Sequence, residues 1–245
     1  MNLKLISLLA FLFILLAGFT VFTVVKKNYL AYNMLRFDPL EENKINPLSG
    51  LKSADIWLIG DSRIDRWDEK LLSPLSDKVV NLGIEGQTSA QVLNRLKNYL
   101  EIGKPRWIFL EVGINDIKII GLDHKLSDAL KTGCFRNITT IIELSRKNNI
   151  KVLVFSIFPT GNIEPLRRLV WNSSVDSAIA QVNDKIRLYC SNNAVKYFDA
   201  SKMLSDSKGK VKSNFQDGFL HINNEAYKVL SSNIIKEFGS EIRIN

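Results

Sequence analysis

Four short segments of the chain hold the types of side chain that acyl transfer requires: a hydroxyl nucleophile, a base, a group that orients the base, and donors for an oxyanion. Each segment borders an apolar run, and the four have the sequences GDSR (60–63), GIEGQT (83–88), GIND (113–116) and DGFLH (217–221). In this arrangement Ser62 attacks a carbonyl carbon, and His221 takes the proton and later returns it to the leaving alcohol. These residues predict an enzyme that cleaves acyl esters.

Three further residues supply the remaining roles. Asp217 is the candidate that stabilises the imidazolium and fixes its tautomer. The backbone N–H groups of Ser62 and Gly86 and the side-chain amide of Asn115 would donate to the oxyanion, each contributing about 3 kcal/mol to transition-state stabilisation. Glycine suits position 86 because a backbone must approach the substrate there without a Cβ in the way. We expect no metal and no organic cofactor in this reaction.

Several of these residues also have a purely structural explanation. Asp61 can cap a helix that begins at the next residue. Asn115 and Asp116 can cap a turn after a strand. His124 is the only other histidine in the chain and competes with His221 for the role of base.

The four segments, in this order, resemble the sequence blocks of the SGNH (GDSL-like) hydrolase superfamily. The stretch from Val79 to Asp116 is similar in pattern and spacing to the bacterial periplasmic thioesterase and lysophospholipase members. The resemblance covers about residues 54 to 238. It implies a flavodoxin-like three-layer fold without a GxSxG nucleophile elbow, and an exported enzyme.

Two positions depart from the family pattern. Arg63 stands where the first block usually has Leu, and it either meets an anionic substrate group or forms a surface salt bridge with Asp65 or Asp68. The family places the catalytic Asp three residues before the His, whereas Asp217 lies four residues before His221. A local bulge or helical turn can bring the two together. Otherwise a backbone carbonyl orients the imidazole and the catalytic unit is a Ser–His dyad.

The elements that position these segments can be predicted from the hydrophobic pattern. Five short apolar runs are typical of strands, and amphipathic segments typical of helices lie between and after them. The runs are 56–60, 78–84, 106–113, 151–158 and 195–200, and the helical segments are 88–102, 128–148, 173–192 and 224–238. This alternation predicts an α/β fold with a five-stranded parallel sheet covered on both faces. Ligands bind such a sheet outside the carboxyl ends of its strands, where the polar segments lie.

An apolar segment from Leu5 to Val25 contains no charged residue, and as a helix it would span the roughly 30 Å hydrocarbon core of a bilayer. We predict an uncleaved membrane anchor over residues 1–27, with a cleaved signal peptide as the alternative. The flanking charges are nearly balanced and do not fix the orientation. The family resemblance implies a periplasmic or extracellular domain. Residues 28–53 are expected to be a tether and residues 54–245 the hydrolase domain.

The composition limits the classes of partner. The 245 residues are 46% apolar and 24% charged, which disfavours disorder and coiled coil. The net charge of +8 comes from Lys and Arg spread along the chain, so we expect no nucleic-acid partner, but a surface that favours anionic neighbours. Cys134 and Cys190 form no metal-binding motif, and we expect two separate buried thiols.

The expected substrate is an ester with a short acyl group, such as an O-acetyl group on an extracytoplasmic glycan. The segments 117–128 and 160–174 would border the mouth of the site, and they mix basic residues with scattered apolar ones, although Ile119, Ile120 and 169–171 could line a short groove. Two other activities of the same fold stay open, an O-acyltransferase and a lysophospholipase or thioesterase. An inactive glycan-binding domain is the last alternative, which the complete catalytic set disfavours.

Overall fold

A five-stranded parallel sheet forms the centre of the molecule, as predicted, with the strand order β2-β1-β3-β4-β5. The strands are β1 (Ile56–Gly60), β2 (Val79–Gly83), β3 (Trp107–Glu111), β4 (Lys151–Phe155) and β5 (Lys196–Phe198). The structure is a computed structural model and describes residues 3–38, 50–165, 168, 171 and 173–243. This strand order is that of the flavodoxin-like doubly wound folds.

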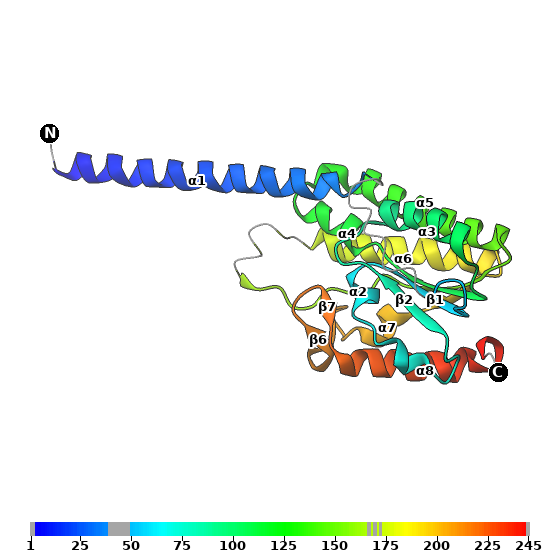
Figure 1. Cartoon of the computed structure of the whole chain (residues 1–245). Coiled ribbons are helices and arrows are strands. Elements are labelled where there is room, and N and C mark those ends of the chain that lie inside the picture. Colours follow the sequence, from blue (N-terminus) through cyan, green and yellow to red (C-terminus); the bar gives the residue numbers. More distant parts are fainter. Residues whose placement is uncertain (1–2, 39–49, 166–167, 169–170, 172, 244–245) are drawn as a thin grey trace.

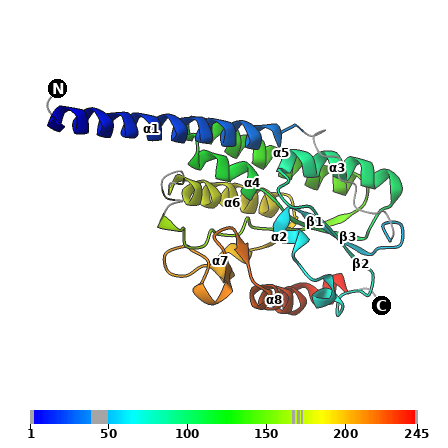
Figure 2. The same ribbon diagram turned by 60° about the vertical axis from the view of Figure 1, so that its left-hand side comes forward.

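Helices cover both faces of the sheet (Figures 1 and 2). One face packs against α3 (Ser89–Ile102), α5 (Ser127–Lys147) and α6 (Ser174–Asn192), and the other against α7 (Ala200–Leu204) and α8 (Asn224–Ile242). Because successive strand residues point to opposite faces, Trp57 and Ile59 enter the first core, whereas Ile56 and Leu58 enter the second. Cys134 and Cys190 are separate buried thiols, as predicted.

Short elements follow the carboxyl ends of the strands and hold the polar segments. These elements are α2 (Ser62–Asp65), η1 (Glu69–Leu72), α4 (Ile114–Ile117), η2 (Lys118–Gly121), η3 (His124–Leu126), η5 (Ser213–Phe215), β6 (Gln216–Asp217) and β7 (His221–Ile222). Asp61 caps α2, since its Oδ1 accepts a hydrogen bond from the Arg63 N–H at 3.0 Å. The structural role expected for Asp61 is thus present, and it places Ser62 at the first position of α2.

The N-terminal helix α1 (Leu3–Leu35) is longer than the apolar segment predicted from the sequence. By length and composition it can cross a membrane, and its most apolar stretch is not buried against the rest of the chain. The helix continues past Val25 into the segment expected to be a tether, and its end packs on the domain: Asn33 is buried, and Leu30 and Phe37 contact the first core. The first part of the expected tether is therefore helical and packed. Residues 39–49 of that tether lie outside the described residues.

Candidate active site

The carboxyl ends of three neighbouring strands bring three of the four polar segments together. Gly60, at the end of β1, lies in register with Gly83 of β2 on one side and with Glu111 of β3 on the other. The segments that follow these residues therefore begin at one edge of the sheet. The fourth segment reaches the same edge through the β6–β7 pair, which contacts α2.

Ser62 and His221 are hydrogen-bonded to each other. The distance from Ser62 Oγ to His221 Nε2 is 3.0 Å, although the residues are 159 positions apart in the chain. Ser62 is buried and His221 is partly buried. The competing base, His124, is exposed at the start of η3. The structure thus pairs the expected nucleophile with the expected base.

Asn115 and Gly86 border the same cavity as Ser62 and His221. Asn115 Nδ2 donates to the Gln87 carbonyl at 3.0 Å, and Asn115 Oδ1 accepts from Lys118 Nζ at 2.7 Å. These two bonds fix the orientation of the amide and leave one Nδ2 hydrogen for a ligand. Gly86 has φ +79°, a left-handed conformation that favours glycine.

This cavity has a volume of about 330 Å³ and is mostly polar. Besides the four predicted residues, its lining comprises Tyr32, Arg36, Glu85, Ile114, Lys118 and Leu220. Only two of these six side chains are aliphatic, and two of the six come from the end of α1. The cavity therefore offers little apolar surface to a ligand. One of its walls, formed by Tyr32 and Arg36, lies outside the α/β sandwich.

Asp217 lies near His221 but is paired with another residue. The two face each other as cross-strand partners of β6 and β7, joined by a tight turn in which Gly218 has φ +67°. The exposed Asp217 carboxylate accepts a hydrogen bond from Arg66 Nη1 at 3.1 Å. Within the described part of the chain, the His221 imidazole hydrogen-bonds only to Ser62. The four-residue spacing thus produces a β-hairpin rather than a direct Asp–His hydrogen bond.

The surroundings of His221 favour its neutral form. Burial, together with the charges of Arg66 and Arg63, lowers the pKa of His221 to about 4, whereas the charges of Glu85 and Asp217 act in the opposite direction. A neutral imidazole can accept the proton of the Ser62 hydroxyl. At neutral pH the pair is therefore in the protonation state that nucleophilic attack requires.

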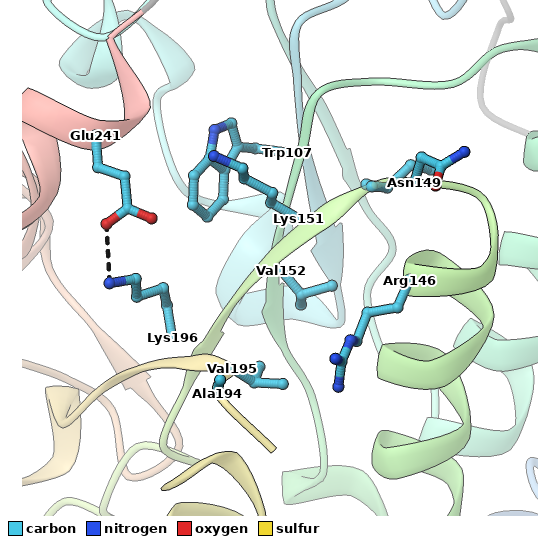
Figure 3. A pocket seen from close by; sticks show the side chains of 10 residues that line it. Trp107, Arg146, Asn149, Lys151, Val152, Ala194, Val195, Lys196 and Glu241 are labelled. Carbon is cyan, nitrogen blue, oxygen red and sulfur yellow. Dashed lines mark ion pairs between the residues drawn. The ribbon is translucent and has the colours of Figure 1, made fainter.

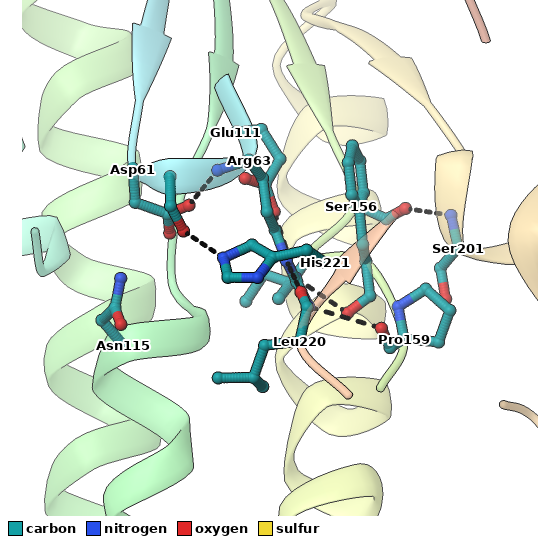
Figure 4. Close-up of polar contacts among 12 residues, drawn as sticks. Asp61, Arg63, Glu111, Asn115, Ser156, Pro159, Ser201, Leu220 and His221 are labelled. Carbon is teal, nitrogen blue, oxygen red and sulfur yellow. Dashed lines mark hydrogen bonds and ion pairs between the residues drawn. The ribbon is translucent and has the colours of Figure 1, made fainter. Parts of the chain in front are cut away.

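Arg63 is fully buried, and the predicted surface salt bridge with Asp65 or Asp68 is wrong. Its Nε donates to the Leu220 carbonyl at 3.0 Å, and its Nη1 donates to the Phe158 carbonyl at 2.9 Å and to Glu111 Oε1 at 3.4 Å (Figure 4). The expected alternative, contact with a substrate anion, does not fit a fully buried guanidinium either. Arg63 instead ties the residue before His221 to the end of β3 and to the loop after β4.

Two other buried polar residues brace the loops around the nucleophile. Asp116 accepts hydrogen bonds from Ser89 N at 2.9 Å and from Ser89 Oγ at 2.6 Å, and burial raises the pKa of Asp116 to about 6. Arg95 donates to Gln87 Oε1 at 3.0 Å and to the Gly60 carbonyl at 3.1 Å. Asp116 therefore joins the third segment to the start of α3, and Arg95 joins the first segment to the second.

Some residues of the site were not identified from the sequence. Lys118 follows Asn115 by one helical turn, and this spacing is a local signal from which their contact could have been predicted. Tyr32, Arg36 and Arg95 reach the site through long-range packing for which the sequence holds no short-range pattern.

A second cavity, of about 300 Å³, lies at the opposite edge of the sheet (Figure 3). It is bordered by Trp107, Lys151 and Lys196, at the amino ends of β3, β4 and β5, and Lys196 forms an ion pair with Glu241 at 2.8 Å. No serine, cysteine or histidine is among its lining residues. Of these two cavities, only the one at Ser62 holds the residue types that acyl transfer requires.

Comparison with known proteins agrees with this geometry. A model of the GDSL-like lipase/acylhydrolase family matches residues 54–229. A GDSL-like lipase from Bacteroides thetaiotaomicron is 20% identical, with 88% of this chain and 97% of that chain covered and a TM-score of 0.64. A lipase/acylhydrolase from Enterococcus faecalis is 20% identical, with 78% and 98% covered and a TM-score of 0.59. A carbohydrate acetylesterase family member from Sinorhizobium meliloti is 15% identical, with 74% and 95% covered and a TM-score of 0.56. No curated protein sequence matches the chain.

Proposed function

The chain belongs to the GDSL-like lipase/acylhydrolase family, and from this premise we propose that it is a serine esterase in which Ser62 is the nucleophile and His221 the base. The observation that supports this proposal most directly is the 3.0 Å contact between Ser62 Oγ and His221 Nε2 in a cavity open to a ligand. A binding domain does not require a hydroxyl paired with a neutral imidazole.

In the proposed reaction, Ser62 Oγ attacks the ester carbonyl carbon while its proton passes to His221 Nε2. The oxyanion that forms receives hydrogen bonds from the backbone N–H groups of Ser62 and Gly86 and from Asn115 Nδ2. The C–O bond to the alcohol then breaks, and His221 gives its proton to the leaving oxygen. A water molecule attacks the acyl-serine and loses a proton to His221, the bond from the acyl carbon to Ser62 Oγ breaks, and His221 returns that proton to Oγ as the acid leaves.

Two charged residues assist in this proposal. Lys118 polarises the Asn115 amide through its bond to Oδ1, which strengthens the donor that meets the oxyanion. Asp217 stabilises the imidazolium from across the hairpin, although its carboxylate is bonded to Arg66. Asp217 then acts through its charge rather than by fixing the tautomer of His221.

The lining of the cavity supports a short acyl group, and we propose an O-acetyl or similar short-chain ester as the substrate. Ile119 and Ile120, which could have extended an apolar groove, are fully buried in the core. Trp171 packs against Phe219 with ring centroids 5.1 Å apart. Residues 169 and 170 lie outside the described part of the chain. An acetylated glycan outside the cytoplasm, close to the membrane that α1 would cross, is the proposed natural partner.

The proposal is tested by labelling with a fluorophosphonate probe and by hydrolysis of p-nitrophenyl acetate and palmitate. Ser62→Ala and His221→Ala should both abolish turnover, because the two residues act as a unit. Ser73→Ala and His124→Ala, which alter exposed residues outside the cavity, are the matched controls. Full labelling of Ser62→Ala would contradict the nucleophile. A kcat/KM at least tenfold higher for palmitate than for acetate would contradict the short acyl group and favour the lysophospholipase alternative.

A further inference from the structure

The end of α1, the helix that is long and apolar enough to cross a membrane, forms one wall of the cavity at Ser62. Tyr32, in the last turns of α1, and Arg36, just after it, line the same cavity as Ser62 and His221. Arg36 is bonded to the second segment at two points: its Nη1 donates to the Gly86 carbonyl at 3.1 Å, and its own carbonyl accepts from Thr88 Oγ1 at 2.7 Å. The wall is therefore joined to the loop that supplies an oxyanion donor.

The Arg36 guanidinium has donors to spare. A guanidinium has five N–H groups, and Arg36 uses two of them in hydrogen bonds to the Gly86 carbonyl and, at 2.6 Å, to the Tyr32 hydroxyl. The guanidinium carbon also lies 4.8 Å from the centre of the Tyr32 ring, which holds the side chain in place. No carboxylate pairs with Arg36 among the residues that the structure describes.

A second cation lines the same cavity. Lys118 is bonded to Asn115 Oδ1, and it forms no ion pair within the described residues. Burial and the nearby charge of Arg36 lower the pKa of Lys118 to about 8. The one acidic residue in the lining, Glu85, is exposed to solvent. Two cations thus share a cavity, and among the described residues neither of them forms an ion pair with a carboxylate.

We propose that Arg36, with Lys118, binds an anionic group of the ester substrate, either a phosphate or a carboxylate. This inference rests on the proposed esterase function of the same cavity. The planar guanidinium can hold two oxygens of such a group at once, which fixes the orientation of the ester as well as its charge. Arg36 is thus a specificity-determining residue supplied by the anchor helix.

The position of the cavity along α1 limits where such a substrate is met. From Val25, the last residue of the apolar segment, to Arg36 there are eleven residues, which correspond to about 16 Å along a helix. The headgroup layer adds only about 5–8 Å to each side of the hydrocarbon core, so the cavity lies about 10 Å beyond the headgroups if α1 crosses the membrane upright. A carboxylate of a surface glycan is present at that height, whereas a lipid phosphate comes into reach only if α1 is strongly tilted.

The experiment compares kcat/KM for anionic and neutral esters with the full-length protein in detergent. One pair is 1-hexanoylglycerol 3-phosphate and 1-hexanoylglycerol, which represents a lipid source. The other pair is acetylated glucuronic acid and acetylated glucose, which represents a glycan source. We expect the wild type to prefer the anionic member of at least one pair, and Arg36→Gln to lower that preference at least tenfold. Arg36→Lys should retain part of it, because the charge remains but the planar fork is lost.

Arg146→Gln is the matched control, since Arg146 lies at the opposite edge of the sheet and should not alter the preference. Fluorophosphonate labelling of Ser62 is measured in every variant and identifies those that have lost a working site. If Arg36→Gln does not label, the inference is tested instead by two measurements. These are the preference of Arg36→Lys for the anionic ester and the salt dependence of the same preference in the wild type. A labelled wild type without anionic preference in either pair would overturn this inference alone, whereas an unlabelled wild type would overturn the esterase itself.

Discussion

Among single residues, Arg63 has a role that its position in the first segment does not suggest. It is fully buried beside Glu111, and it donates to the carbonyl of Leu220, the residue immediately before the base. Burial, together with the charge of Asp61, raises the pKa of Glu111 to about 8, and Arg63 opposes that shift. The guanidinium thus contacts a buried acid that is mostly protonated at neutral pH, and it holds the loop of His221 in place.

Arg63→Leu, which restores the residue usual in the family, should therefore destabilise this chain. The change removes the donors to the Leu220 and Phe158 carbonyls, and each buried acceptor left without a partner typically costs about 1–3 kcal/mol in the free energy of unfolding. Urea denaturation followed by circular dichroism measures the change. The double variant Arg63→Leu/Glu111→Gln should recover little of the loss, since the two carbonyls still lack their donor. Unchanged stability of the single variant would show that these hydrogen bonds do not hold the loop.

The pH dependence of activity should report the depressed pKa of His221. Only the neutral imidazole acts as base, so kcat/KM for a neutral ester should stay level as pH falls and then decrease with an apparent pKa near 4. Arg66→Gln removes a cation that lowers this pKa and should move the decrease to higher pH. Asp217→Asn removes a carboxylate that raises it and should move the decrease to lower pH, with a smaller loss of activity than His221→Ala.

These profiles are measured on full-length protein, with Arg146→Gln as the control and with activity reassayed at neutral pH to exclude irreversible unfolding. If Arg66→Gln and Asp217→Asn moved the pH of the decrease in kcat/KM in the same direction, the electrostatic roles given to both residues would be contradicted. A decrease of the wild-type kcat/KM near the ordinary histidine pKa of about 6.5 would contradict the lowered pKa of His221.

Among the elements, the turn between β3 and α4 depends on a glycine. Gly113 has φ +135°, and a Cβ there would lie 2.6 Å from Ile157 Cδ1 and 2.9 Å from Cys134 Sγ. Gly113→Ala should lower stability by about 1–3 kcal/mol through backbone strain and also reduce kcat, because Asn115 follows two residues later. Gly133→Ala is the matched control: this glycine lies inside α5 with open space around it, and the change should be neutral or stabilising by up to about 1 kcal/mol. Equal thermal stability of the two variants would show that the turn tolerates a side chain.

The elements with a strong local pattern were predictable from the sequence. The apolar run 56–60 coincides with β1, and the amphipathic segment 88–102 differs from α3 by one residue. The run 151–158 was predicted too long, because buried apolar residues such as Ile157 and Phe158 continue after β4 ends at Phe155. Hydrophobicity alone does not distinguish a buried loop from a strand.

The parts of the site that depend on distant contacts were not predictable in the same way. The contact of Ser62 with His221 was expected from the residue types and the order of the segments. The partner of Asp217 was not, because Arg66 meets it only once the β6–β7 hairpin lies beside α2. Nor did the polar residues after the apolar segment predict that α1 extends to Leu35 and brings Tyr32 to the cavity.

At the scale of the whole molecule, the direction of α1 across the membrane decides where the enzyme acts. Lys4 stands before the apolar segment and Lys26 and Lys27 follow it, which leaves the orientation nearly balanced. We predict that the domain lies outside the cytoplasm. In a bacterial host, a phosphatase that is active only after export should be active when fused after Asn245. Activity of a cytoplasm-only reporter at the same position, with silence of the phosphatase, would reverse the orientation.

The junction of α1 with the domain has a kinetic consequence. Because α1 is a continuous helix and Arg36, the residue after it, is hydrogen-bonded to the Gly86 loop, insertion of α1 into a membrane would leave the cavity at Ser62 little freedom to move away from the bilayer surface. Anchoring an enzyme beside surface-bound substrate replaces diffusion through bulk solution by encounters within a thin layer, where effective concentrations are on the order of millimolar for short tethers. An ester fixed to the same membrane can then be turned over despite weak intrinsic affinity, whereas an identical ester free in solution would be met only at its bulk concentration.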